Sequence, residues 1–115
     1  MSINRNEIAL KRLKGKKRIE HLFRVGESLH SKHLLLRYIT TEEKDGFCMG
    51  VSVAKRRFNK AHDRNRIKRQ MREAVRANRE SFTFSGMGML IFKGGKEVDT
   101  KTLLLECEEL LRNLN

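Results

Sequence analysis

The sequence predicts an α+β fold, a two-layer sandwich with the element order α-β-β-β-α-β-α and a four-stranded sheet. Three segments carry apolar residues at the spacing of an amphipathic helix, and four carry the short apolar runs typical of strands. The segment between the last two strands contains one of the helices and is long enough for a βαβ crossover. At 115 residues the chain is predicted to form a single domain, 1–115, whose first 15 residues form a flexible basic arm.

The first helix is predicted over Gly15–Val25. Ile19, Leu22 and Phe23 lie there at positions i, i+3 and i+4, and Gly26 supplies a stop signal. The remaining positions of this segment are mostly basic, so the helix is expected to have a basic outer face.

Three strands are predicted after this helix. They span Ser28–His30, His33–Thr40 and Phe47–Ala54, with an acidic turn at Glu42–Gly46. Gly46 favours a chain reversal, so the third of these strands is expected to run antiparallel to the second.

The second helix is predicted to start near Lys60–Asp63 and to run to about Arg79. At 100° per residue, its apolar positions form one stripe, which consists of Ile67, Met71, Ala74, Val75 and Asn78. A basic face lies nearly opposite and consists of Asn65, Lys68, Arg69, Arg72, Arg76 and Arg79. Arg64 falls near the buried edge, and Arg66 falls on a separate flank.

The last strand and the last helix are predicted at Met87–Phe92 and after Asp99 or Thr100, which can cap the helix. The apolar stripe of this helix consists of Leu103, Leu104, Cys107, Leu110 and Leu111. Three glutamates, Glu106, Glu108 and Glu109, make the helix acidic, so it is expected to face away from any polyanion.

Positive charge is concentrated around the second helix. Lys55–Arg79 holds eleven of the 26 basic residues and two acidic ones, which gives +9 of the total net charge of +12. Lys68 and Arg72, and Arg72 and Arg76, are like-charged pairs at i,i+4, which destabilise a solvated helix unless a partner compensates them. A polyanionic partner is therefore predicted, and nucleic acid is the obvious one.

Other classes of function find little support. The longest apolar runs are too short to span a bilayer, and no aromatic-rich amphipathic segment suggests a membrane surface. Cys48 and Cys107 have no zinc-ligand spacing and are expected to be buried free thiols in a reducing cytoplasm. The four histidines form no metal pair with carboxylates at ligand spacing and are expected to be solvated, although a weak surface site at His30 and His33 stays open. We therefore expect a binding protein without catalytic residues or a metal of its own.

Three further features have two interpretations each. Lys55-Arg56-Arg57 either contacts RNA or is simply solvated. Phe23 and Tyr38 are either platforms on which unpaired bases stack or ordinary core residues.

The run from Arg64 to Arg69, followed by Arg72-Glu73-Ala74, resembles the Arg-Asn-Arg helix of the protein subunit of bacterial ribonuclease P. Leu13, Phe23 and Gly26 around the first helix, and the strand Gly50–Lys55, fit the same family. The element order matches along essentially the whole chain.

The resemblance implies a left-handed βαβ crossover and two RNA sites. The catalytic-RNA contacts would be Arg64, Asn65, Arg66, Lys68, Arg69, Arg72 and Arg76. The single-stranded 5′ leader of precursor tRNA would lie in a cleft between the side of the Arg-Asn-Arg helix and the sheet, and the cleft would involve Phe23, Arg37, Tyr38, Lys55 and Arg56. Many relatives have aromatic residues where this chain has Ile19 and Arg37, and Arg37 is expected to supply charge or a cation–π contact instead.

The resemblance also implies a division of labour. The RNA subunit would remove the leader with Mg²⁺ that the RNA mainly binds, and the protein would strengthen substrate and ion binding in the cytoplasm, without a membrane or an obligate protein partner. Three alternatives are weaker. A ribosomal protein would use the same basic helix on ribosomal RNA. A DNA-binding regulator would need a turn-linked helix pair, and a self-sufficient nuclease would need carboxylates for two metals.

Overall fold

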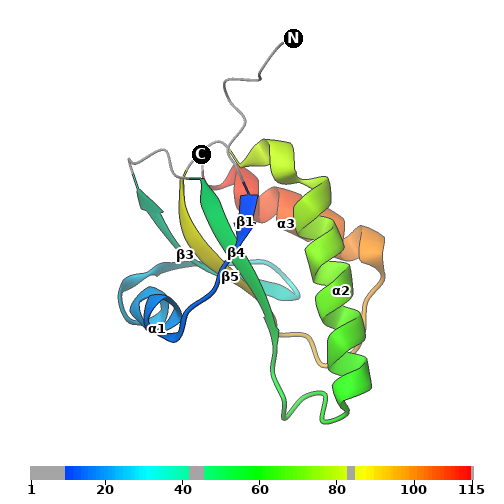
Figure 1. The fold of residues 1–115 in the computed structure, drawn as a ribbon. Coiled ribbons are helices and arrows are strands. Elements are labelled where there is room, and N and C mark those ends of the chain that lie inside the picture. Colours follow the sequence, from blue (N-terminus) through cyan, green and yellow to red (C-terminus); the bar gives the residue numbers. More distant parts are fainter. Residues whose placement is uncertain (1–9, 42–45, 83–84, 115) are drawn as a thin grey trace.

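The computed structural model describes residues 10–41, 46–82 and 85–114, which form a five-stranded mixed sheet with three α-helices (Figure 1). In chain order the elements are β1 (Leu10–Arg12), α1 (Lys16–Val25), β2 (Glu27–His30), β3 (Leu34–Thr41), β4 (Phe47–Val53), α2 (Ala61–Ala77), the short 3₁₀ helix η1 (Arg79–Ser81), β5 (Ser85–Phe92) and α3 (Thr100–Arg112). The seven predicted helices and strands are all present in the predicted order, which confirms the α+β class. The strand order is β1-β4-β5-β3-β2, so β5 lies between β3 and β4.

Strand β1 is an addition to the predicted four-stranded sheet. It pairs in parallel with β4, from Leu10 beside Phe47 to Arg12 beside Met49. The amide of Leu13 then donates to the carbonyl of Met49 at 3.1 Å, and the Leu13 side chain is buried. The predicted flexible arm is therefore wrong for residues 10–13, while residues 1–9 lie outside the described part of the chain. Three residues are too few to show strand alternation, and their partner is distant in sequence.

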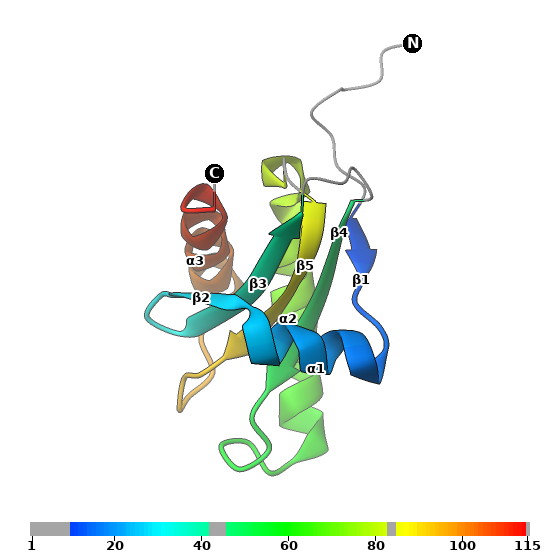
Figure 2. The ribbon, with the colours of Figure 1, turned by 90° about the vertical axis from the view of Figure 1, so that its left-hand side faces the viewer.

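The βαβ crossover is formed by β4, α2 and β5. The two strands are adjacent and parallel, with Phe47 beside Gly86 and Val53 beside Phe92. In Figure 2, both strands run downwards, α2 lies behind the sheet, and β5 is to the left of β4. This arrangement makes the crossover left-handed, as the family resemblance implies.

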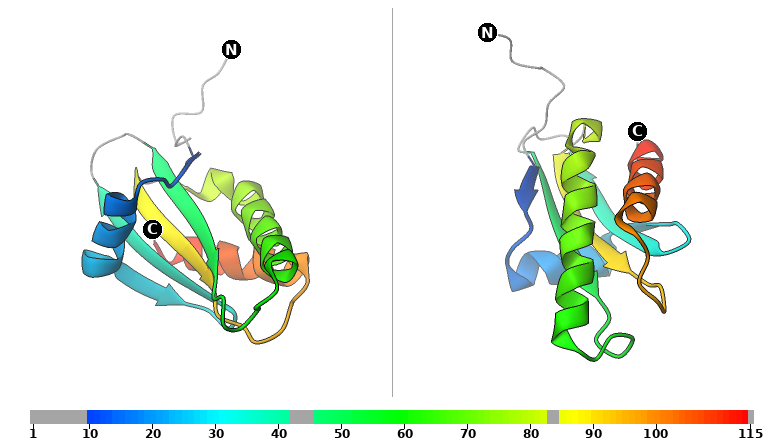
Figure 3. Two further views of the ribbon diagram at one scale, coloured as in Figure 1. Left: turned by 60° about the horizontal axis from the view of Figure 1, so that its bottom comes forward. Right: turned by 90° about the vertical axis from the view of Figure 1, so that its right-hand side faces the viewer.

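The main core lies between the sheet and the two helices α2 and α3 (Figure 3). The stripe predicted for α2 is buried at every position: Ile67, Met71, Ala74, Val75 and Asn78. On α3, Leu103, Cys107, Leu110 and Leu111 are buried as predicted, whereas Leu104 is only partly buried. Burying one side chain of this size contributes about 1.5–3 kcal/mol, so this layer holds α2 firmly on the sheet.

Helix α1 covers part of the opposite face of the sheet and closes a second, smaller core (Figure 3). Leu22 is fully buried there with Leu13, Cys48 and Met89. The sheet and α2/α3 thus form the predicted two layers, and α1 adds a partial third. Gly26 ends α1 with extended backbone, and glycine is required at this position because a Cβ would lie only 2.5 Å from the Leu22 carbonyl oxygen.

Helix α3 is fixed at its start and at its middle. The Asp99 side chain accepts a hydrogen bond from the Thr102 amide at 2.9 Å, which makes Asp99 the N-cap. Glu106, one of the three glutamates that make this helix acidic, has a side chain that is only 13% exposed and that binds the turn between β2 and β3. Ser31 Oγ and the His33 amide donate to Glu106 Oε1 at 2.5 and 2.8 Å, and His33 Nδ1 lies 2.5 Å from Oε2. His33 is therefore engaged by Glu106 and is not the solvated histidine that we expected.

The two cysteines are buried free thiols, as predicted. Burial raises the pKa of the Cys107 thiol to about 12, against the smaller opposing effect of a hydrogen bond with Asn78. Arg18 Nη2 lies 3.4 Å from the Cys48 sulfur. Among the residues described, no helix combines the length and apolarity needed to cross a bilayer.

Candidate nucleic-acid interface

The face of α2 opposite the buried stripe is open to solvent. Asn65, Arg69, Arg72, Arg76 and Arg79 are exposed, and Lys68 is half-buried. In the described part of the chain there are three ion pairs, and none of them includes these six residues. The outward basic face predicted by helical phasing is confirmed, and within residues 10–41, 46–82 and 85–114 no carboxylate forms an ion pair with it.

Arg64, predicted as an RNA contact, is turned inwards. Its Nη1 donates to the carbonyl of Phe58 at 2.8 Å, across the loop that connects β4 with α2. The Phe58 ring in turn packs against Phe92 of β5, with 5.8 Å between ring centroids. This guanidinium therefore holds the loop against the start of α2, which agrees with its predicted position near the buried edge.

Arg66 lies on the other flank of α2, as phasing predicted. Its Nη1 is 3.3 Å from Glu97 Oε1, in the connection between β5 and α3, and its Nη2 is 3.5 Å from His62. About half of the Arg66 side chain is exposed. It is thus accessible to a ligand, but it faces a different side from Arg72 and Arg76.

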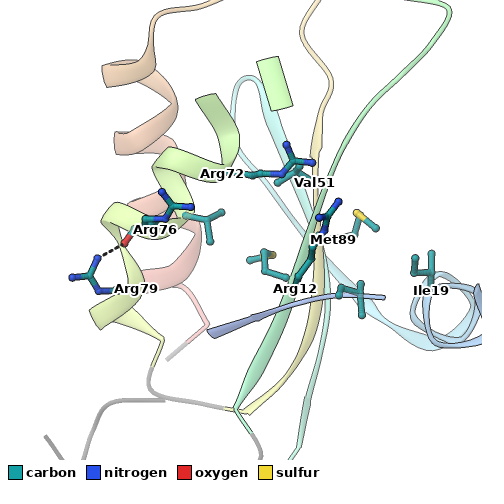
Figure 4. A pocket seen from close by; sticks show the side chains of 11 residues that line it. Arg12, Ile19, Val51, Arg72, Arg76, Arg79 and Met89 are labelled. Atoms are coloured by element: carbon teal, nitrogen blue, oxygen red, sulfur yellow. Dashed lines mark hydrogen bonds between the residues drawn. The ribbon is translucent and has the colours of Figure 1, made fainter. Parts of the chain in front are cut away.

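A groove of about 710 Å³ extends from the second half of α2 past the sheet edge formed by β1 and β4 to Ile19 of α1 (Figure 4). Four arginines line it: Arg12 from β1, Arg72 and Arg76 from α2, and Arg79 from η1. Its other lining residues are apolar or glycine: Leu13, Ile19, Met49, Gly50, Val51, Val75 and Met89. Arg12 was not among the predicted site residues, because no local pattern marks it and only the pairing of β1 with β4 brings it here.

Phe23 and Arg37, two of the predicted leader contacts, lie together on the α1 side of the sheet. The Phe23 side chain is 43% exposed, so it is not an ordinary core residue. Arg37 Nη2 donates to the Phe23 carbonyl at 2.9 Å, and Nη1 donates to Ser28 Oγ at 2.8 Å. The two residues form one connected unit between α1, β2 and β3.

Tyr38, which was predicted for the same cleft, lies on the other face of β3. It packs against the main core with Leu34 and Leu36, because alternate residues of a strand point to the same face. Burial raises the pKa of its hydroxyl, and the nearby charge of Glu27 adds a smaller effect in the same direction. The structure therefore does not bring Tyr38 together with Phe23 and Arg37, and it places the partly buried Tyr38 against the main core.

Lys55 and Arg56 lie in an exposed turn directly after β4. The Ala54 carbonyl accepts hydrogen bonds from the amides of Arg57 and Phe58 at 3.2 and 3.3 Å, which closes this turn. This turn lies at the end of the sheet where the chain passes from β4 towards α2 (Figure 1). Within the described residues, no group of three His, Cys, Asp or Glu side chains could hold a metal ion.

Comparison with known proteins places this arrangement in a family. A family model described as ribonuclease P matches residues 9–115. A ribonuclease P protein component from Pectobacterium atrosepticum is 41% identical over 64 residues, which cover 56% of this chain and 54% of that protein. One from Edwardsiella ictaluri is 38% identical over a segment of the same length. The matched segment thus spans about half the length of these relatives.

Solved structures agree with the fold. The RNase P protein of Staphylococcus aureus has a TM-score of 0.77 at 23% identity, with 90% of this chain and 94% of that chain covered. The RNase P protein of Thermotoga maritima has a TM-score of 0.71 at 25% identity, with the same coverage. With the family model matching nearly the whole length, the chain belongs to the ribonuclease P protein family.

Proposed function

We propose that the chain is the protein subunit of a ribonuclease P holoenzyme. It binds the catalytic RNA and the single-stranded 5′ leader of precursor tRNA, and it assists the Mg²⁺-dependent removal of that leader. The observation that carries this proposal is the exposed basic face of α2, whose arginines have no carboxylate partners among the ion pairs of the described residues. Such a face suits the phosphates of a folded RNA, because arginine forks bind phosphate oxygens in pairs.

The two RNA sites fall on different parts of the molecule. Asn65, Lys68, Arg69, Arg72 and Arg76 are assigned to the catalytic RNA, with Arg66 on the flank. Phe23 is assigned to the leader, because an exposed aromatic ring on a cationic surface supports base stacking worth about 1–3 kcal/mol. Lys55 and Arg56 extend the leader site by supplying charge next to the sheet.

The chemistry is assigned to the RNA. Among the described residues, no group of three His, Cys, Asp or Glu side chains could hold a metal ion, and the contribution proposed for the protein is binding and orientation. In this proposal the RNA holds most of the Mg²⁺, and the reaction takes place in the cytoplasm. By lowering repulsion between two RNA molecules, the basic face would reduce the Mg²⁺ concentration that cleavage requires.

Reconstitution tests the proposal. The protein is mixed with the candidate catalytic RNA and a precursor tRNA at low Mg²⁺, and cleavage at the mature 5′ end is followed. We expect restored cleavage and tighter binding of precursor than of mature tRNA. If neither effect is observed, the proposal is wrong. Cleavage without any RNA subunit would point to a self-sufficient nuclease instead.

A further inference from the structure

The connection between β4 and α2 carries a short basic turn, residues 55–57, whose three side chains are exposed (Figure 1). Two amides donate to the Ala54 carbonyl and close this turn at its start. After the turn, the partly buried Phe58 packs against the main core. Lys60, the N-cap of α2, makes no side-chain cap hydrogen bond. The path of the chain from Phe58 into α2 is therefore not set by the helix cap.

One side chain joins this connection to α2. Arg64, near the start of the helix, donates from Nη1 to the Phe58 carbonyl at 2.8 Å. Because the donor is a charged guanidinium, this hydrogen bond is stronger than one between two neutral groups. Phe58 is itself anchored, since its ring centroid lies 5.8 Å from that of the buried Phe92. The hydrogen bond therefore ties α2 to a fixed point that directly follows the basic turn.

Arg64 differs from its neighbours on α2 in where its side chain points. Asn65 and Arg69 are exposed, whereas Arg64 is partly buried and is directed at the loop. None of the three ion pairs within the described ranges includes Arg64. An RNA phosphate that bound this guanidinium would have to compete with the Phe58 carbonyl. The geometry thus favours a contact inside the protein over a contact with RNA.

The hydrogen bond of Arg64 lies between the two proposed RNA sites. Asn65, its neighbour in the chain, is assigned to the catalytic RNA, and Arg56, two residues before Phe58, is assigned to the leader. A turn that is already held in one orientation loses less conformational freedom on binding than a loose one. Fixing the basic turn before the leader arrives would therefore strengthen leader binding without any new contact to RNA.

We propose that Arg64 is a positioning residue. Through the Phe58 carbonyl it holds the basic turn in the orientation in which Lys55 and Arg56 meet the leader, and it does not contact RNA itself. The inference rests on the proposed function for the identity of the leader, whereas the holding of the turn is a property of the free chain.

Limited proteolysis of the free full chain tests the holding of the turn. Trypsin cuts after lysine and arginine, so the basic turn supplies three sites, and mass spectrometry identifies the cuts. Arg64→Met removes the donor but keeps a long side chain, and cleavage in the turn should rise about fivefold. Asn78→Ala is the control, because it loses buried hydrogen bonds at the far end of α2, and it should change cleavage in the turn less than about twofold.

Binding to the reconstituted holoenzyme tests the consequence for the leader. Arg64→Met should lower the preference for precursor over mature tRNA about fivefold, while the affinity for the catalytic RNA stays within about twofold. The combined Lys55→Met and Arg56→Met variant should lower the preference at least as much. Adding Arg64→Met to it should cause no further loss, because Arg64 acts through these two side chains. Asn78→Ala should keep the preference, although it is also less stable.

Three results would overturn the inference. The first is unchanged cleavage of the turn in Arg64→Met, or in Arg64→Ala where the first variant does not fold. The second is a further loss of preference when Arg64→Met is added to the combined variant, since Arg64 would then act independently. The third is a loss of catalytic-RNA affinity as large as that of Arg69→Met, since Arg64 would then contact that RNA.

The proposed function fails separately. If the unchanged protein restores processing but Arg64→Met keeps the full preference for precursor tRNA, the inference alone is wrong. If the unchanged protein restores no processing, the proposed function is wrong, and the cleavage test still decides whether Arg64 holds the basic turn.

Discussion

The guanidinium of Arg37 binds the backbone of Phe23, with Nη2 2.9 Å from the Phe23 carbonyl oxygen. That carbonyl belongs to the last turn of α1, where the helix dipole concentrates negative charge that a cation stabilises. The second hydrogen bond, from Nη1 to Ser28 Oγ, ties the same guanidinium to β2. Arg37 therefore fixes the end of α1 on the hairpin of β2 and β3 and holds the exposed Phe23 ring in place. Nothing in the sequence around Arg37 indicated this role, which is additional to the charge that we expected it to supply.

Arg37→Met is the first prediction. The substitution removes both hydrogen bonds while it keeps a long side chain, so the free energy of unfolding should fall by about 1–3 kcal/mol. Because Phe23 would lose its fixed position, binding of precursor tRNA should weaken several-fold, and binding of the catalytic RNA should change little. Urea unfolding and fluorescence anisotropy with each RNA measure the two effects.

Phe23→Ala is the matched variant for this prediction. It should remove the preference for precursor over mature tRNA without the loss of stability, because the ring is exposed. Equal losses for the catalytic RNA and the precursor would instead mean that both substitutions act on the fold.

The second prediction separates two arginines of the same helix. Arg64→Ala loses the hydrogen bond to the Phe58 carbonyl and should lower the free energy of unfolding by about 1–3 kcal/mol. Arg69→Ala, at an exposed position, should leave stability within about 0.5 kcal/mol and weaken RNA binding. Chemical unfolding and catalytic-RNA titrations of both variants test the assignment. If the Arg64→Ala protein is as stable as the unchanged protein but binds RNA more weakly, Arg64 contacts RNA and the structural role is wrong.

The features that the sequence predicted correctly are those with local periodicity. The buried stripe of α2 from Ile67 to Asn78 and its opposite basic face both follow from 3.6 residues per turn. The positions of Arg64 and Arg66 away from that face follow from the same geometry. The sequence could also have predicted that Arg37 and Tyr38 lie on opposite faces of the sheet, because adjacent residues of a strand point to opposite faces. Both residues were nevertheless assigned to one cleft.

The features that it did not predict depend on pairs distant in sequence. The edge strand β1 has only three residues, and its identity as a strand depends on the partner Phe47–Met49. Arg12 consequently joins Arg72 and Arg76 through the tertiary fold alone. In the same way, nothing near Glu106 indicates that its carboxylate would meet Ser31 and His33. Charge and hydropathy alone would leave the Glu106 side chain in solvent, and only the docking of α3 on β3 buries it.

The third prediction concerns salt. A face that neutralises about five to eight phosphates gives a slope of log affinity against log salt of about −4 to −7. Reversing the charge at Arg69 and Arg72 should make the slope shallower by about one unit or more for each lost contact. The measurement is a titration of the catalytic RNA at several salt concentrations, with Lys101→Glu as a control on α3. An unchanged slope would mean that the face of α2 is not the site.

The fourth prediction concerns the pH dependence of the stability that comes from the contact between Glu106 and the turn between β2 and β3. Burial tends to raise the pKa of the Glu106 carboxyl, but hydrogen bonds from Ser31 and His33 outweigh it, and the net pKa is lowered. A pKa below that of the unfolded chain means that the carboxylate stabilises the fold above the ordinary glutamate pKa of about 4.3. This contribution is lost as the pH falls through the lowered pKa.

Glu106→Gln should therefore reduce the free energy of unfolding by about 1–3 kcal/mol at pH 7, because the side chain that accepts these hydrogen bonds loses its charge. The difference from the unchanged protein should shrink below about pH 4, where the native carboxyl also becomes protonated. Urea unfolding at a series of pH values measures it. Glu108→Gln is the control on the same helix, since the exposed pair of Glu108 with Arg112 should contribute less than about 1 kcal/mol. If the difference for Glu106 grew on acidification, the lowered pKa would be wrong, and the contact with Ser31 and His33 would not depend on an ionised carboxylate.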